Sequence, residues 1–175
     1  MVQRKRLKNT RNGLLVENPI GELQSNSTSI LPLSNFDLID AASALAIKNF
    51  RGVFMRYQLP KQPKRVETGI INLDNSSGEG THWVAYAIDP RGIVYFDSYG
   101  LAPPSEFMRY IISTSHSIPI FYSMLPTQQL NDPLICGHEV LNVLAEISRF
   151  PQKPPHIVVN EYTSGRLLEN QKHLQ

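Results

Sequence analysis

Apolar residues recur at helical spacing in three stretches of the chain. The spacing predicts helices over residues 36–47, from about 105 to 112, and from 136 to about 149. Ser34 or Asn35 can cap the first of them, because a short polar side chain satisfies the free N–H groups of a first turn. Pro151 and the pair Pro154-Pro155 end the third.

Short runs of β-branched and aromatic residues, bounded by turn residues, lie between these helices. They predict strands over residues 53–55, 68–73, 81–88, 92–97 and 118–122. Asp89-Pro90-Arg91-Gly92 is a compact turn signal, so the third and fourth strands should form an antiparallel hairpin. Consecutive strands with short turns favour an α+β fold with a mixed or antiparallel central sheet flanked by helices.

Charge divides the chain, although its 175 residues carry a net charge of only +2. The first eleven residues carry +5, from Arg4, Lys5, Arg6, Lys8 and Arg11, and the remainder carries −3. We expect residues 1–30 to be a flexible basic arm, residues 31–155 the folded domain, and residues 156–175 a C-terminal tail. The arm is a candidate nuclear import signal or nucleic-acid contact, and a solvated terminus is the alternative.

Composition excludes several classes of protein. No apolar run approaches the ~20 residues of a membrane span, and no apolar segment of a secretory signal follows the basic N-terminus. Cys136 is the only cysteine, which excludes an internal disulfide and a zinc site with two thiolates. We therefore expect a protein of a reducing compartment that is not secreted, avoids membranes and uses no metal or other cofactor.

Two side chains with acid–base chemistry flank the predicted hairpin. His82 lies where its first strand begins, and Asp97 lies where its second strand ends. The start of one antiparallel strand meets the end of its neighbour, so these two residues should lie together. A lone histidine or a lone strand-end aspartate is more often structural, but a carboxylate beside an imidazole fixes its tautomer and stabilises the imidazolium.

Cys136 opens the last predicted helix and is followed by Gly137. A helix N-terminus favours the thiolate, and a protonated His82 nearby would favour it further. A buried, unreactive cysteine is the alternative. A thiolate that attacks an acyl group also needs donors for the oxyanion: the Cys136 N–H is one, and Gln128 or Gln129 in the preceding loop is the other, unless both are solvated loop amides.

The order His, Asp, Gln, Cys is that of a papain-like cysteine peptidase fold with a permuted chain. Residues 33–147 resemble the adenovirus-type cysteine endopeptidase (adenain) family, in the same clan as the ubiquitin-like-protein proteases. The resemblance is carried by Asn35-Phe36-Asp37, Asn49-Phe50-Arg51-Gly52-Val53-Phe54, Gly80-Thr81-His82-Trp83-Val84, Tyr95-Phe96-Asp97-Ser98-Tyr99-Gly100 and Cys136-Gly137.

The resemblance implies a role for five positions. His82 would be the general base, Asp97 the acid that orients it, Cys136 the nucleophile, and Gln129, by its spacing, the oxyanion donor. Trp83 would form an aromatic wall beside the base and contact the substrate, with a core tryptophan as the alternative.

The chain departs from the adenovirus pattern in three respects. Its acid is Asp97 instead of glutamate, as in the ubiquitin-like-protein proteases. It ends soon after the predicted catalytic helix, so we expect the additional C-terminal helices to be reduced or missing. It has no second cysteine for a disulfide-tethered activating peptide.

The resemblance implies a cysteine endopeptidase that processes viral or virus-like precursor proteins, with small residues, above all glycine, near the cleaved bond. We expect a monomer located in the host-cell nucleus, the cytoplasm or the virion. The first alternative is a protease that removes a ubiquitin-like modifier, since the same residues would serve it. A second is a binding module that keeps the fold without catalysis. A third is a nucleic-acid-binding protein, supported by the basic arm with Lys61, Lys64 and Arg65.

Overall fold

The predicted helices and strands are present close to their expected positions, and one further helix follows them. The computed structural model describes residues 31–74, 82–112, 118–127 and 135–172. In these ranges the helices are α1 (Asn35–Ala44), α2 (Ser105–Ile112), α3 (Cys136–Arg149) and α4 (Pro155–Lys172). The strands are β1 (Phe50–Met55), β2 (Glu67–Asn72), β3 (Trp83–Asp89), β4 (Gly92–Phe96) and β5 (Ile120–Tyr122). The basic arm, residues 1–30, lies outside the described residues.

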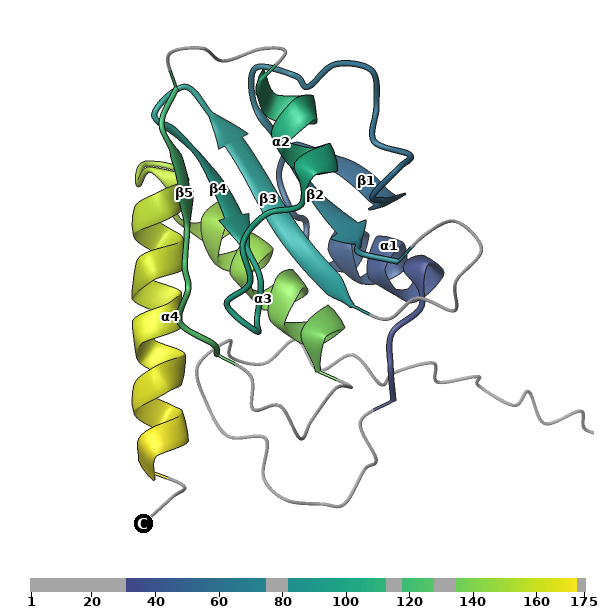
Figure 1. Cartoon of the computed structure of the whole chain (residues 1–175). Coiled ribbons are helices and arrows are strands. Elements are labelled where there is room, and N and C mark those ends of the chain that lie inside the picture. Colours follow the sequence, from purple (N-terminus) through teal and green to yellow (C-terminus); the bar gives the residue numbers. More distant parts are fainter. Residues whose placement is uncertain (1–30, 75–81, 113–117, 128–134, 173–175) are drawn as a thin grey trace, which may run out of the picture.

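The strands form one mixed sheet in the order β1-β2-β3-β4-β5 (Figure 1). The central pairs β2–β3 and β3–β4 are antiparallel, whereas β1 and β5 each run parallel to their neighbour. The predicted hairpin is present, with Asp89 opposite Gly92 at its turn. The expected α+β class and the mixed sheet are therefore confirmed.

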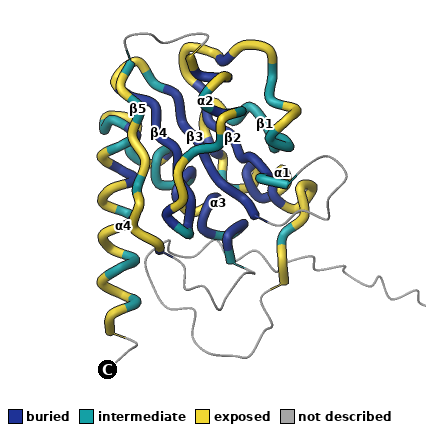
Figure 2. The backbone as a smooth tube through the Cα atoms, in the orientation of Figure 1, coloured by how far each residue is buried: buried dark blue, intermediate teal, exposed yellow. Residues whose placement is uncertain are grey.

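Helices cover both faces of this sheet. On one face α1, α3 and α4 pack over residues such as Ala85 and Phe96, and on the other α2 packs over Tyr86 and Tyr95. Figure 2 shows the consequence, since the central strands are buried along their length. Side chains alternate between the faces of a strand, so a strand covered on both faces reads as a continuous apolar run.

A buried glutamate joins β2 to α2. Glu67 has no exposed surface, and its carboxylate accepts hydrogen bonds from the hydroxyls of Tyr86 (3.1 Å) and Tyr110, and from Arg51 (3.3 Å). Burying a carboxylate is unfavourable unless such donors surround it. Gly69 makes room for this arrangement, because a Cβ at this position would lie 2.6 Å from the Tyr86 ring.

Helix α4 corrects the prediction of a C-terminal tail over residues 156–175; of the expectation that helices after α3 are reduced or missing, it excludes a complete absence. It spans 18 residues, begins at Pro155 and packs against α3 and the sheet. The prolines that end α3 also begin α4, because proline suits the first position of a helix. Polar anchors hold this helix: Glu139 of α3 accepts hydrogen bonds from Tyr162 (3.0 Å) and Arg166 (2.7 Å). Because these contacts are polar, α4 lacks the pronounced apolar stripe by which an amphipathic helix is predicted from its sequence.

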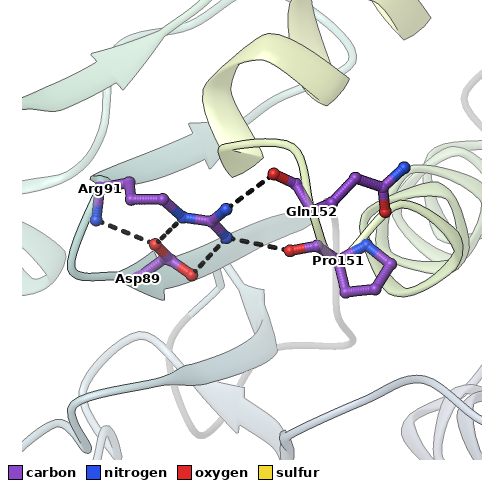
Figure 3. Close-up of polar contacts among 4 residues, drawn as sticks. All are labelled: Asp89, Arg91, Pro151 and Gln152. Atoms are coloured by element: carbon purple, nitrogen blue, oxygen red, sulfur yellow. Dashed lines mark hydrogen bonds and ion pairs between the residues drawn. The ribbon is translucent and has the colours of Figure 1, made fainter.

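An arginine clamp fixes the hairpin turn to the connection between α3 and α4 (Figure 3). Arg91 donates to both carboxylate oxygens of Asp89 and to the backbone carbonyls of Pro151 and Gln152, at 2.7–3.2 Å. This end of the hairpin is thus held by side-chain contacts, and the candidate site residues His82 and Asp97 lie at its opposite end. Among the described helices, none combines the length and apolar character that a membrane crossing requires.

Two glycine substitutions test this packing. Gly165 lies exposed within α4 with no atom near the position of a Cβ, so Gly165→Ala should raise the free energy of unfolding by about 0.5–1 kcal/mol.

Gly69→Ala should lower the free energy of unfolding by about 1–3 kcal/mol, because the new methyl group collides with Tyr86. Urea unfolding of both variants measures the change. A destabilising Gly165→Ala would contradict the helix, and a neutral Gly69→Ala would contradict the close contact.

Candidate active site

The open end of the hairpin brings His82 and Asp97 together. Ala85 of β3 pairs with Phe96 of β4, so His82, just before β3, and Asp97, just after β4, lie at the same end of the sheet. The His82 Nε2 atom is 2.8 Å from Asp97 Oδ1, and both side chains are buried. The same carboxylate oxygen accepts the backbone N–H of Tyr99 at 2.7 Å. One carboxylate oxygen thus holds both the imidazole and the following turn.

Cys136 approaches the His82–Asp97 pair from helix α3. It is the first residue of α3, is only 5% exposed, and lies in the core cluster that includes Trp83 and Ala85 of β3. The helix begins without a side-chain cap: Ile135 occupies the N-cap position and makes no side-chain hydrogen bond there. The backbone N–H groups of Trp83 and Gly137 interact with the sulfur atom. The packing of α3 on β3 therefore places the thiol beside His82.

Charge interactions couple the thiol to the imidazole. Burial acts to lower the pKa of His82, but hydrogen bonds and charges from Asp97 and Cys136 outweigh it and raise the pKa to about 9. Burial acts to raise the pKa of the Cys136 thiol, but His82 and the two backbone N–H groups outweigh it and hold the pKa below its ordinary value. Both shifts favour an imidazolium–thiolate pair at neutral pH.

The two ring nitrogens of His82 have different surroundings. Nε2 contacts Asp97, whereas Nδ1 is buried and makes no well-aligned hydrogen bond within the described part of the chain. Cys136 raises the pKa of the imidazole through a side-chain hydrogen bond and its charge, so the thiol lies within interaction range of His82. Nδ1 is the nitrogen left for proton exchange with sulfur.

The structure places Trp83 in the core. Its side chain is 8% exposed, and its indole N–H donates to the backbone carbonyl of Leu33 at 3.0 Å. Trp83 therefore fixes the segment that leads into α1 against β3. This position agrees with the alternative of a core tryptophan; contact with a substrate stays a prediction.

Gln128 and Gln129 lie outside the described residues, so the predicted oxyanion donor stays a prediction. The residue before them, Thr127, is buried and anchored on both sides. Its N–H donates to the carbonyl of Ser98 at 2.9 Å, and its carbonyl accepts from Asn170 of α4 at 2.8 Å. The described residues contain no group of three or more His, Cys, Asp or Glu side chains that could hold a metal ion.

Sequence reasoning gave no role to Tyr99. Its ring lies against the imidazole of His82, with centroids 4.5 Å apart and planes inclined by 31°. The sequence did contain a signal for this contact. Tyr99 follows Asp97 by two residues and precedes Gly100, and a tight turn at this point places Tyr99 near the end of the strand.

The described residues thus place a cysteine, a histidine and an aspartate at one end of a mixed sheet with helices on both faces, an arrangement that can support a nucleophilic thiolate. No known protein family's profile matches the chain. It is 36% identical over 72 residues to the SUMO-1 cysteine protease S273R of African swine fever virus, covering 37% of this chain and 26% of that protein. It is 34% identical over 83 residues to the cysteine protease S273R of another isolate, covering 43% of this chain and 29% of the relative.

The chain thus spans only about a quarter of the length of these curated relatives. The crystal structure of the pS273R protease of this virus has a similar fold, with a TM-score of 0.50, 19% identity, and coverage of 74% of this chain and 61% of that one. The chain is therefore distantly similar to a viral cysteine protease, over part of its length in sequence and over most of its length in fold.

The charge coupling at this site can be tested by replacing Asp97. Asp97 stabilises the imidazolium, which in turn stabilises the thiolate, so Asp97→Ala should lower the pKa of His82 from about 9 by about one unit or more. The thiolate should then form at higher pH. The NMR titration of the His82 ring and the pH dependence of Cys136 alkylation by iodoacetamide measure the two effects.

Asp40→Ala is the matched control, because Asp40 is an exposed aspartate of α1, outside the hairpin. It should leave both titrations unchanged. Equal titrations for the Asp97→Ala variant and the parent would contradict the coupling.

Proposed function

We propose that this chain is a cysteine peptidase, with Cys136 as nucleophile, His82 as general base and Asp97 as the residue that orients the imidazole. The observation that carries the proposal is the meeting of these three side chains at one end of the sheet, with the sulfur at a helix N-terminus. The fold would then be the papain-like one with a permuted chain, in which histidine and aspartate precede the cysteine.

The proposed reaction proceeds in two stages. The Cys136 thiolate attacks the carbonyl carbon of the scissile bond, and the resulting oxyanion is held by the Cys136 N–H and the Gln129 amide. The imidazolium of His82 then gives its proton to the leaving amine, and a thioester remains. In the second stage His82 takes a proton from water, hydroxide attacks the thioester, and the thiolate and a carboxylic acid are released.

Two substrate classes fit these residues, and the comparisons favour the second. Processing of viral or virus-like precursor proteins is the first. Removal of a ubiquitin-like modifier is the second, and it is favoured by the name "SUMO-1 cysteine protease" of a relative that is 36% identical over the matched segment. A module that only binds is disfavoured, because Cys136 begins a helix beside the His82–Asp97 pair and the pKa of its thiol is held below its ordinary value, which is typical of nucleophilic cysteines. The basic arm would at most add a nucleic-acid contact.

Replacement of the nucleophile tests the activity directly. Cys136→Ala should lower cleavage by at least ~10³-fold and leave the fold unchanged, since the other residues of such a site give little catalysis without a nucleophile. Small ubiquitin-like modifiers fused through their C-terminal glycine to a reporter, and precursor peptides with glycine at the cleaved bond, form the substrate panel. Cleavage by Cys136→Ala at the parent rate would refute the proposal, and the preferred substrate would decide between the two classes.

Substitutions of the neighbouring Gln128 and Gln129 form a matched pair that tests which glutamine is the oxyanion donor. Gln129→Ala should lower kcat by about 10²–10³-fold with little change in KM, because the lost donor acts on charge that develops in the transition state. Gln128→Ala, one residue away, should stay within a few-fold of the parent. Steady-state kinetics on the best panel substrate measure both, and the reverse ranking would move the donor to Gln128.

A further inference from the structure

The turn after β4 is held rigidly behind the candidate active site. The N–H of Gly100 donates to the carbonyl of Asp97 at 3.0 Å, and Gly100 has a positive φ of 72°, which favours glycine. A Cβ at Gly100 would lie 2.7 Å from the carbonyl oxygen of Met124, so this turn and the segment after β5 are in direct backbone contact. Thr127 adds a further hydrogen bond to Ser98 at 2.9 Å. Residues 97–100 therefore have little freedom to move.

Tyr99 uses this rigid turn to contact both partners of the buried pair. Its backbone N–H donates to Asp97 Oδ1 at 2.7 Å, which is the oxygen that lies 2.8 Å from His82 Nε2. Its ring lies on the imidazole, with centroids 4.5 Å apart. The backbone of one residue thus fixes the carboxylate, and its side chain covers the ring that this carboxylate orients.

We propose that Tyr99 is a positioning residue of the site: its ring fixes the plane of the His82 imidazole and excludes water from the His82–Asp97 hydrogen bond. This inference rests on the proposed function, because it assigns Tyr99 to the same reaction. The role is assigned to the aromatic ring, so Tyr99→Phe should retain it.

Two physical reasons support this role. The torsion that turns an imidazole about its last side-chain bond has broad minima, so a ring contacted on its face is held more firmly than one that faces solvent. A hydrogen bond to a carboxylate also strengthens when water is kept away from it. The pair is almost completely shielded, with 9% of the His82 side chain and none of the Asp97 side chain exposed, and Tyr99 is a half-buried residue that supplies part of that cover.

The neighbours of the pair limit the alternatives. Cys136 of α3 contributes to the charge balance of the imidazole, and Tyr95 of β4 has a pKa raised by burial and by the charge of Asp97. Neither side chain is altered by a substitution of Tyr99. A change in the imidazole after that substitution therefore reports on the Tyr99 ring.

The test compares Tyr99→Ala with Tyr99→Phe by two measurements that need no substrate. The first is the NMR signal of the imidazole Nε2–H of His82, which exchanges slowly with water only while it is covered. The second is the pH dependence of Cys136 alkylation by iodoacetamide. Tyr99→Ala should lose the Nε2–H signal and move the acid limb of alkylation upward by about one pH unit, a roughly tenfold loss of thiolate on that limb. Tyr99→Phe should restore both.

Controls separate this role from a merely structural one. Tyr57→Ala removes an exposed tyrosine from the segment after β1 and should leave both measurements unchanged. Thermal unfolding verifies that each variant is folded, and Tyr99→Ser, which suits a turn, replaces Tyr99→Ala if the latter fails to fold. Parent-like exchange and alkylation in the folded truncation, or a Tyr99→Phe variant as defective as the truncation, would overturn the inference.

A failure of the proposed peptidase function can be distinguished from a failure of the inference about Tyr99. A parent protein that cleaves none of the panel substrates would remove the peptidase assignment, while exchange of the His82 Nε2–H would still decide whether Tyr99 covers the imidazole. If the assignment holds, the truncation should lower kcat by about tenfold with KM nearly unchanged, because a mispositioned base affects the transition state more than substrate binding.

Discussion

The register of the β3–β4 hairpin is the constraint on which the candidate site depends. Because the two strands are antiparallel and Ala85 lies opposite Phe96, His82 and Asp97 meet at the open end. A shift by one residue would turn each side chain of the slipped strand to the other face of the sheet and separate the pair. The apolar side chains of both faces oppose such a shift, and the Arg91 clamp holds the turn at the far end.

Three buried carboxylates, those of Glu67, Glu139 and Asp97, make hydrogen bonds between the elements around the candidate site. Glu67 links β2 to α2 through the hydroxyl of Tyr110, and it also accepts from a second tyrosine and an arginine of the neighbouring strands. Glu139 links α3 to α4 through the hydroxyl of Tyr162 and the guanidinium of Arg166. Both are fully supplied with donors, as a buried charge requires. Asp97 differs, because its Oδ2 atom is buried without a hydrogen-bond partner in the described part of the chain. The first two carboxylates serve the fold, whereas the third retains unsatisfied acceptor capacity where chemistry is proposed.

Local patterns in the sequence were enough to predict the hairpin, the helix that begins at Cys136 and the pairing of His82 with Asp97, because each depends on residues close in sequence or on strand alternation. Helix α4 could not be predicted in this way, since its attachment relies on Arg166 and Tyr162 finding a glutamate on another helix. The contact of Tyr99 with His82 was equally hidden, because it depends on the conformation of a turn. Tertiary contacts between polar groups leave little periodic signal.

A buried imidazolium–thiolate pair is unfavourable for a fold unless it is well compensated, and here the compensation comes from opposite directions. Asp97 and the backbone of Tyr99 support the imidazole side, whereas the N-terminus of α3 and the backbone N–H groups of Trp83 and Gly137 support the sulfur. The hairpin and the helix are formed by distant parts of the chain, and His82 and Cys136 come together only where these two elements dock. The pKa shifts of His82 and Cys136 are therefore properties of the packed tertiary structure, and a change that loosens the packing of α3 on β3 acts on the chemistry even when it touches neither residue.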